Sequence, residues 1–453
     1  MKQQKAAVNM TAGRPGKALL IFALPLILGN LFQQFYGIID SVVVGQFVGQ
    51  EALASVGASS SITNVFIAVA IGGGVGSSVV VSQYLGAGQT GNMKTAVSTT
   101  LINFLILSLF LGAAGWLLHP SILHWMNTPD NVFSDAAVYL GIYFLGLPFL
   151  FMYNVQASVF QAMGDSRTPL YLLIFSSFTN IVLDLTFVVS FGMGVGGVAA
   201  ATLIAQGISA VVSFAFLMRR LKECCSTEPF RFYDCQMMAH MLKVAIPSIL
   251  QQSIVNIGML LVQSVINGFG SGVMAGYAAA SRIESICIVP MLAVGNAMST
   301  FTAQNIGAGQ TERVRAGYRY CYGLLAVFAF IIWAMMSLWG DVFVRCFLSD
   351  GMANAAFQTG MGYVNFISCF YILIGLKAAT DGLLRGAGDV IVFTAANLVN
   401  LTIRVAVAFL LAPVVGVQAV WYAIPMVWGA NYAISFIRYL SGKWKGVSLI
   451  APK

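Results

Sequence analysis

Two aspartates lie in apolar stretches of the chain, where a carboxylate needs a partner. Asp40 occurs in FYGIIDSVVVG and Asp184 in FTNIVLDLTFVV, and Asn180 precedes Asp184 by one helical turn on the same face. In a low-dielectric environment, a carboxylate that has bound a proton or a cation is more stable than one that is free and charged. Hard cations prefer carboxylate and amide oxygens. We therefore expect Asp40, Asn180 and Asp184 to bind H⁺ or Na⁺ rather than to form a purely structural polar network.

Five further charged residues lie in apolar stretches; Arg404 is one of them, and the other four differ in their spacing. Lys377 and Asp381 are four residues apart, which suits a structural ion pair on one helix face. Arg282 and Glu284 are two residues apart and cannot face each other on a helix. An ionisable residue at a helix centre costs about 2.5–3.5 kcal/mol on insertion scales, so it normally faces a cavity. We expect Arg282 and Glu284 to line a substrate cavity in the second half.

Paired glutamines follow two prolines that begin corresponding stretches of the chain. Gln33 and Gln34 follow Pro25, and Gln251 and Gln252 follow Pro247. An unsatisfied amide facing lipid is costly, so at least one member of each pair should face a cavity. We assign Gln34 and Gln251 to the same substrate cavity. The aromatic share of 12% and the 20 methionines suit a plastic, apolar cavity with cation–π capacity.

The composition shows what surrounds these residues. Hydrophobic residues make up 58% of the chain, charged residues 8%, and the mean hydropathy is +0.84. Soluble domains carry roughly 25% charged residues, so most of this surface must face lipid. The net charge of +8 comes from basic residues in short loops between apolar runs, as membrane insertion requires, and does not indicate nucleic acid. The seven cysteines show no metal-binding spacing.

Twelve apolar runs are long enough to cross a bilayer, which takes about 20 residues each. The expected spans of the first half lie near 18–44, 54–82, 95–118, 135–162, 169–191 and 195–218. Those of the second half lie near 241–267, 273–303, 316–340, 356–383, 390–412 and 416–439. Basic residues concentrate at the termini and in the loops on their side, including the polar stretch 219–236. The opposite loops hold acidic residues and only Arg345, so both termini are predicted to be cytoplasmic.

The chain is internally duplicated. QYLGAGQT at 83–90 recurs as QNIGAGQT at 304–311, and FQAMGDSRTP at 160–169 corresponds to LLRGAGDVIV at 383–392. Both phrases read as turns, where Asp165 and Asp389 can cap the following helix. A repeat near half the chain length indicates two copies of one multi-helix unit. We expect two six-helix lobes, residues 1–225 and 226–453, related by a pseudo-two-fold axis along the membrane normal.

The two copies differ in their buried acids. Asp40 corresponds to Val262 (40 + 222), and Asp184 corresponds to Arg404 (184 + 220), although Asn180 corresponds to Asn400. Ion binding should therefore be concentrated in the first half.

Motifs for catalysis are missing from the sequence. The glycine-rich runs at 72–76 and 194–197 lack a P-loop lysine and suit close helix packing, and there is no HExxH or GxSxG. The three histidines are dispersed. We expect neither an enzyme nor a bound cofactor.

The opening LPLILGNLFQQFYGIIDSVVVGQFVG, the duplicated QxxGAGQT and the turn FQAMGDSRTPL resemble the multidrug and toxic compound extrusion (MATE) transporters over essentially the whole chain. ASRIES at 280–285 with QNIGAGQ resembles the bacterial branch that includes the staphylococcal MepA-like pumps. The resemblance implies a proton or sodium site of Asp40, Asn180, Asp184 and Thr202. In another branch of the family, coupling acids lie on spans seven and ten, but span seven of this chain holds no acid.

The resemblance implies a monomeric antiporter of the cell inner membrane that is driven by H⁺ or Na⁺. Its expected substrates are small organic cations or amphipathic drugs. The alternative is a flippase for a lipid-linked oligosaccharide, which would need several basic residues in its cavity, and the spans of the first half have none.

Overall fold

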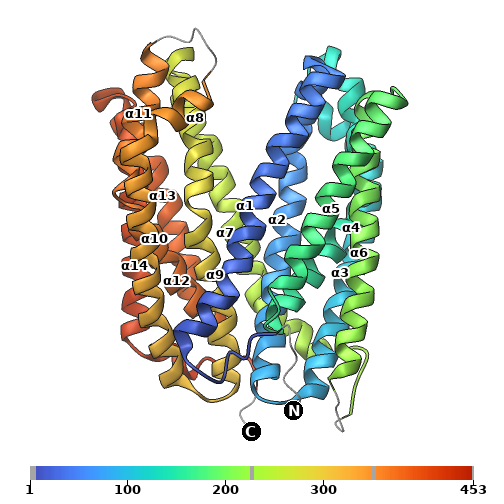
Figure 1. Cartoon of the computed structure of the whole chain (residues 1–453), viewed down its shortest axis with the longest axis vertical. Helices are drawn as coiled ribbons and strands as arrows, with labels where there is room; N and C mark the ends of the chain where they lie inside the picture. The colour runs from blue at the N-terminus through green and yellow to red at the C-terminus, as the bar shows by residue number, and fades with distance from the viewer. Residues whose placement is uncertain (1–6, 225–228, 349–353, 451–453) are drawn as a thin grey trace. The chain divides into compact units, whose positions relative to one another are not determined.

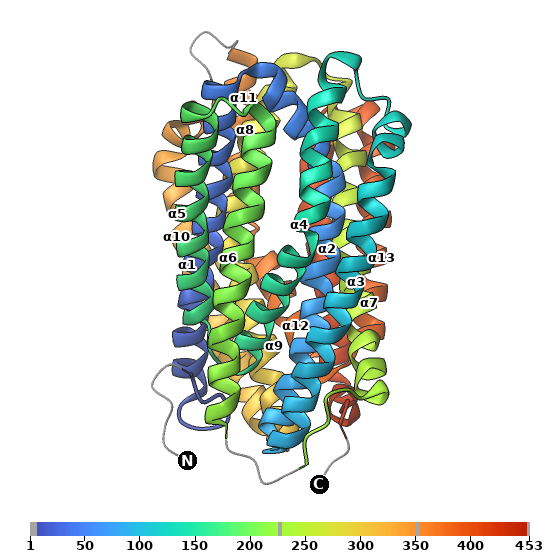
Figure 2. The same ribbon diagram turned by 90° about the vertical axis from the view of Figure 1, so that its right-hand side faces the viewer.

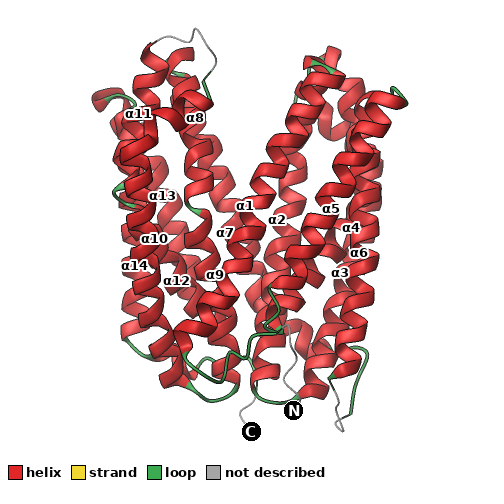
Figure 3. Cartoon of the chain, viewed as in Figure 1, coloured by secondary structure: helices red, strands yellow, loops and turns green. Residues whose placement is uncertain are grey.

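The computed structural model describes residues 7–224, 229–348 and 354–450, which form helices and turns with no strand among them (Figures 1 and 3). The first half contains α1 (Pro15–Val43), η1 (Val44–Val48), α2 (Gln50–Gly86), α3 (Thr90–Trp125), α4 (Asp130–Ala162), α5 (Arg167–Leu185), η2 (Thr186–Ser190) and α6 (Gly194–Glu223). The second half contains α7 (Cys235–Asn267), α8 (Ser271–Cys287), α9 (Val289–Gly307), α10 (Thr311–Cys346), α11 (Asn354–Ser368), α12 (Tyr371–Ala387), α13 (Val390–Val415), α14 (Gln418–Leu440) and η3 (Lys443–Gly446). The all-α polytopic class is confirmed.

Ten helical segments of the described residues are long and apolar enough to cross a membrane. The pair α11 and α12, bent by 53°, makes an eleventh if it is taken as one broken span. The twelfth expected span is the helix α14, which is not among these segments because its Trp, Tyr and Asn residues lower its hydropathy. The twelve expected runs are therefore all helical.

Contacts between residues divide the chain into two compact units. Unit 1 comprises mainly Leu28–Ile249, and unit 2 comprises Val8–Ile27 together with the chain from Leu250 onward. The helices α1 and α7 are thus each divided between the units, two residues after Pro25 and two residues after Pro247. The boundary expected at residues 225 and 226 lies outside the described residues.

Unit 1 is built around α2, which packs against α3 and α4, while α6 packs against α4 and α5. Figure 2 shows α2, α3, α4 and α6 running lengthwise. Glycines let α2 approach the first part of α7 closely, since a Cβ on Gly76 would lie 2.6 Å from the backbone nitrogen of Ala245. Small residues at helix contacts favour such close packing in lipid.

Unit 2 has its tightest contact between α9 and α12. A Cβ on Gly382 would lie 2.1 Å from the carbonyl oxygen of Gly295, and one on Gly386 would lie 2.3 Å from that of Ser299. The spacing of Gly382 and Gly386 places both on one face of α12. This face therefore needs residues without a side chain.

The repeated turns have the same backbone form in both halves. Gly88 and Gly309 both have φ of +71°, a conformation that favours glycine. Asp165 caps α5 as expected, because its Oδ1 accepts from the backbone N–H groups of Arg167 and Thr168. The capping expected of Asp389 is wrong, since its side chain makes no cap bond to α13 and pairs with Arg438 instead.

We predict that Gly382→Ala lowers the stability of the purified protein by about 1–3 kcal/mol, because overpacking a close contact forces the backbones apart. Thermal unfolding in detergent measures this loss as a lower Tm. The matched control is Gly323→Ala on α10, where a Cβ meets nothing within 4 Å. Equal Tm values for the two variants would contradict the proposed close contact.

Candidate functional site

A polar cluster in unit 1 is centred on the side-chain amide of Asn180 on α5. In the amide orientation that satisfies all its neighbours, Nδ2 donates to Asp184 Oδ2 at 2.9 Å and to Tyr36 Oη at 2.6 Å. Its Oδ1 accepts from the backbone N–H of Thr202 at 3.2 Å and from the Thr202 hydroxyl at 3.3 Å. Asn180 therefore connects α1, α5 and α6.

Asp40 on α1 adds a second carboxyl group to this cluster. The Asp40 and Asp184 side chains lie close enough for a hydrogen bond between them. Oδ1 of each residue is buried and has no partner among the described residues. The ion pairs formed by the described residues involve neither aspartate. Two facing carboxyl groups without a basic partner favour a shared proton or a bound cation.

The structure thus brings together Asp40, Asn180, Asp184 and Thr202, the four residues expected to bind the ion. Their oxygens are of the carboxylate, amide and hydroxyl types that hard cations prefer. The same arrangement suits a proton held between two carboxylates. The role of these residues in ion binding stays a prediction.

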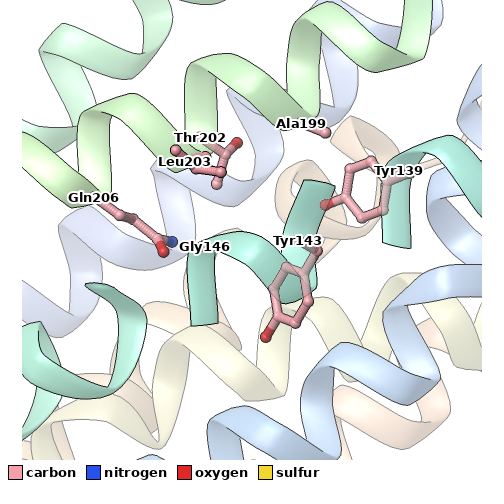
Figure 4. Close-up of a pocket in the computed structure, with 7 residues that line it drawn as sticks. All are labelled: Tyr139, Tyr143, Gly146, Ala199, Thr202, Leu203 and Gln206. Carbon is pink, nitrogen blue, oxygen red and sulfur yellow. The ribbon is translucent and has the colours of Figure 1, made fainter. Parts of the chain in front are cut away.

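Sequence reasoning missed three tyrosines beside the cluster. Tyr36 bonds to Asn180, and Tyr139 lies near enough to both aspartates to interact with their charges. Tyr139 and Tyr143 project from α4 into a small pocket, to which Thr202 and Gln206 contribute from α6 (Figure 4). The available signal was spacing, because Tyr36 precedes Asp40 by four residues and so shares its helix face.

Widened helical turns follow both acids. The π-helix η1 begins four residues after Asp40, and η2 begins two residues after Asp184. Such turns are rare and frequently occur at functional sites. A buried apolar cluster holds them at the same level of unit 1; it consists of Val44, Ala52, Val188, Val195 and Val198. This packing positions the ends of α1 and α5, and hence the two carboxyl groups.

The four residues expected to line a substrate cavity are not brought together within one unit. Gln34 belongs to unit 1 and is exposed, whereas Gln251, Arg282 and Glu284 belong to unit 2. Arg282 is exposed and Gln251 is half-buried. Glu284 and Arg282 thus do not face each other, as the spacing predicted. The part of all four residues in substrate binding stays a prediction.

Glu284 lies in a second polar cluster, in unit 2. Its carboxylate accepts a hydrogen bond from Tyr363, whose ring meets those of Tyr277 and Trp421. The charge of Arg404 acts on Glu284, but no hydrogen bond or ion pair joins them among the described contacts, and Arg404 Nε is buried without a partner. Tyr363 occupies the repeat position of Tyr139 (139 + 224 = 363). The two units thus place different charges on equivalent helices.

The structural ion pair expected on α12 is confirmed. Lys377 Nζ lies 3.2 Å from Asp381 Oδ2, and Ser435 donates to Asp381 Oδ1 at 2.7 Å. Both charged side chains are largely buried and neutralise each other. Asp381 therefore differs from Asp40 and Asp184, which form no ion pair with any residue that the structure describes.

Comparisons with known proteins cover most of the chain. The family model described as MatE matches residues 25–186 and 247–410. The "Probable multidrug resistance protein YpnP" of Bacillus subtilis is 31% identical over 451 residues, covering 99% of this chain and 100% of that protein. The "Multidrug export protein MepA" of Staphylococcus haemolyticus is 21% identical over 412 residues, covering 90% of this chain and 89% of that protein.

Solved structures share the fold. A MOP superfamily transporter from Pyrococcus furiosus matches with a TM-score of 0.90 and 23% identity, covering 98% of this chain and 100% of that chain.

Proposed function

The chain belongs to the MATE family of multidrug transporters, and from this premise we propose that it exports organic, often cationic, amphipathic compounds in exchange for H⁺ or Na⁺. The observation that carries the exchange mechanism is the pair of facing carboxyl groups, Asp40 and Asp184, with no basic partner among the described residues. Such a pair is stabilised when an ion binds and is destabilised when the ion leaves. A transporter can use that difference to couple an ion gradient to export.

The helix α1 links the proposed ion site to a point where the protein can change conformation. Asp40 lies in the part of α1 grouped with unit 1, whereas Pro25 lies in the part grouped with unit 2. A proline inside a helix removes one backbone hydrogen bond and permits bending. An ion at Asp40 drives transport only if it binds one conformation more tightly than the other. We propose that the bend of α1 near Pro25 is what distinguishes those conformations.

The composition of the spans favours drug export over the flippase alternative. The apolar spans of the first half carry no lysine or arginine to meet the phosphates of a lipid-linked oligosaccharide. Gln34 and Gln251 offer neutral hydrogen bonds, and Glu284 offers a negative charge that suits an organic cation. Reconstituted vesicles given ethidium and, separately, a lipid-linked precursor discriminate between the two activities.

We predict that Asp40→Asn and Asp184→Asn each reduce gradient-driven efflux by at least about tenfold, in the range typical of coupling free energies. Asparagine keeps the shape of the side chain but removes the charge that holds the ion. Efflux from vesicles under a pH gradient and, separately, under a Na⁺ gradient measures the loss and identifies the ion. Asp135→Asn, at an exposed position of α4, is the control. Wild-type efflux by both buried variants at equal expression would exclude this ion site.

We also propose that both termini face the cytoplasm, as the distribution of basic residues indicates. Two exposed cysteines test this orientation: Cys235 at the start of α7 and Cys346 at the end of α10. In intact cells that express single-cysteine variants of the protein, an impermeant maleimide should label Cys346 and not Cys235. Inverted vesicles should give the opposite pattern. Labelling of Cys235 from outside intact cells would reverse the proposed topology.

A further inference from the structure

A pocket outside the carboxyl cluster lies where α4 ends, α5 begins and α6 ends. Two arginines and two acidic residues line it beside two aromatic rings; the lining residues are Phe160, Asp165, Thr168, Phe216, Arg219, Arg220 and Glu223. All of these residues belong to unit 1. The transport mechanism proposed above does not use any of them.

Arg220 is the unusual member of this lining. Its side chain is only 13% exposed, and its Nη1 lies 3.6 Å from Glu223 Oε2. Its Nε and Nη2 are buried and have no partner among the described residues. Buried donors without an acceptor cost free energy, and a guanidinium presents such donors in a geometry that matches two oxygens of one anion.

Asp165 does not supply the missing acceptor. Its Oδ1 accepts from the backbone N–H groups of Arg167 and Thr168, and its Oδ2 accepts from the Thr168 hydroxyl at 2.7 Å. Both Asp165 oxygens are thus engaged at the N-terminus of α5. Glu223 lies near both Arg219 and Arg220, so the acidic residues of the lining leave Nε and Nη2 of Arg220 without an acceptor among the described residues.

In the second half, the corresponding aspartate pairs with an arginine of α14. There Arg438 Nε lies 2.6 Å from Asp389 Oδ2, and Nη2 lies 3.3 Å from Oδ1. The phrase Gly194-Val195 recurs as Gly416-Val417, and with this offset of 222 Arg438 corresponds to Phe216 (216 + 222 = 438). The first half has an aromatic ring where the second has the pairing guanidinium, and its arginines lie about one turn further along α6.

We propose that this pocket binds the phosphate group of a phosphodiester, with Arg220 as the principal ligand and Arg219 assisting at the rim. A phosphodiester presents two anionic oxygens that can accept from the unpartnered Nε and Nη2 of Arg220. The pocket lies at helix ends, where the headgroups of a bilayer lie, and basic pockets between transmembrane helices bind such headgroups. Phe216 is 51% exposed and adds apolar surface beside the arginines.

Native mass spectrometry of the purified full chain, titrated with phosphatidylglycerol, tests the proposal. Arg220→Gln should weaken lipid binding by about tenfold or more, as expected for loss of a charged hydrogen-bond partner. Lys222→Gln is the matched control, because it removes one positive charge from the same helix end but does not line the pocket. It should change binding by less than about twofold.

Phe216→Arg is the sharper variant. It places an arginine at the position that corresponds to Arg438, the partner of Asp389 in unit 2. The new side chain should fill the pocket and weaken lipid binding, although it adds a positive charge. Non-specific attraction predicts the opposite, a gain in binding. Thermal unfolding in lipid-free detergent shows whether each variant is folded.

A second titration with soluble glycerophosphoglycerol distinguishes the sources of the phosphate. Binding of this compound, weakened by Arg220→Gln, would assign the pocket to a soluble phosphodiester; binding of phosphatidylglycerol alone would assign it to a lipid. Wild-type affinity for both compounds in folded Phe216→Arg, or equal effects of Arg220→Gln and Lys222→Gln, would overturn the proposal.

Discussion

Two carboxyl groups that face each other among apolar helices are the constraint on which unit 1 depends. Asp40 and Asp184 each leave one buried oxygen without a partner among the described residues. The Asn180 amide is already occupied, because it donates to Asp184 and Tyr36 and accepts from Thr202. Packing alone cannot stabilise this arrangement, because like charges at close range oppose each other in a low dielectric. We propose that an ion or a proton supplies the compensation, so that its binding or release changes the energy of unit 1.

The duplicated backbone carries different chemistry in its two copies. Asn180 and Asn400 correspond, but Asp184 is replaced by Arg404, and a carboxylate near this arginine lies instead on α8 as Glu284. Tyr139 and Tyr363 occupy equivalent positions and both lie beside acidic residues. One helix plan thus supports an acid pair in unit 1 and an acid near an arginine in unit 2. We propose that this difference lets unit 1 respond to an ion through its acid pair, whereas Glu284 in unit 2 remains available to an organic cation.

Much of the site could be predicted because its signals are local. A carboxylate in an apolar span is conspicuous at any position, and the four-residue spacings of Asn180 with Asp184 and of Lys377 with Asp381 indicate shared helix faces. Tyr36, Tyr139 and Tyr143 were missed because aromatic residues are common in spans, and only the packing of α1, α2, α4 and α5 gives these three a polar neighbour. Likewise, Asp389 resembles a helix cap in sequence, and only the fold brings Arg438 to it. The division of α1 and α7 between the units depends on contacts across the whole chain, which no local pattern records.

The claim that the acid pair controls transport is tested most directly by equilibrium binding of a fluorescent organic cation to the purified protein in detergent. Linkage requires that an ion which shifts the conformation also shifts drug affinity, and by the same factor in both directions. We expect the affinity of the wild type to depend on pH or on Na⁺ concentration, and we expect this dependence to vanish in Asp40→Asn. If the affinity of Asp40→Asn keeps the full ion dependence of the wild type, the coupling site lies elsewhere in the protein, and Glu284 becomes the carboxylate to examine.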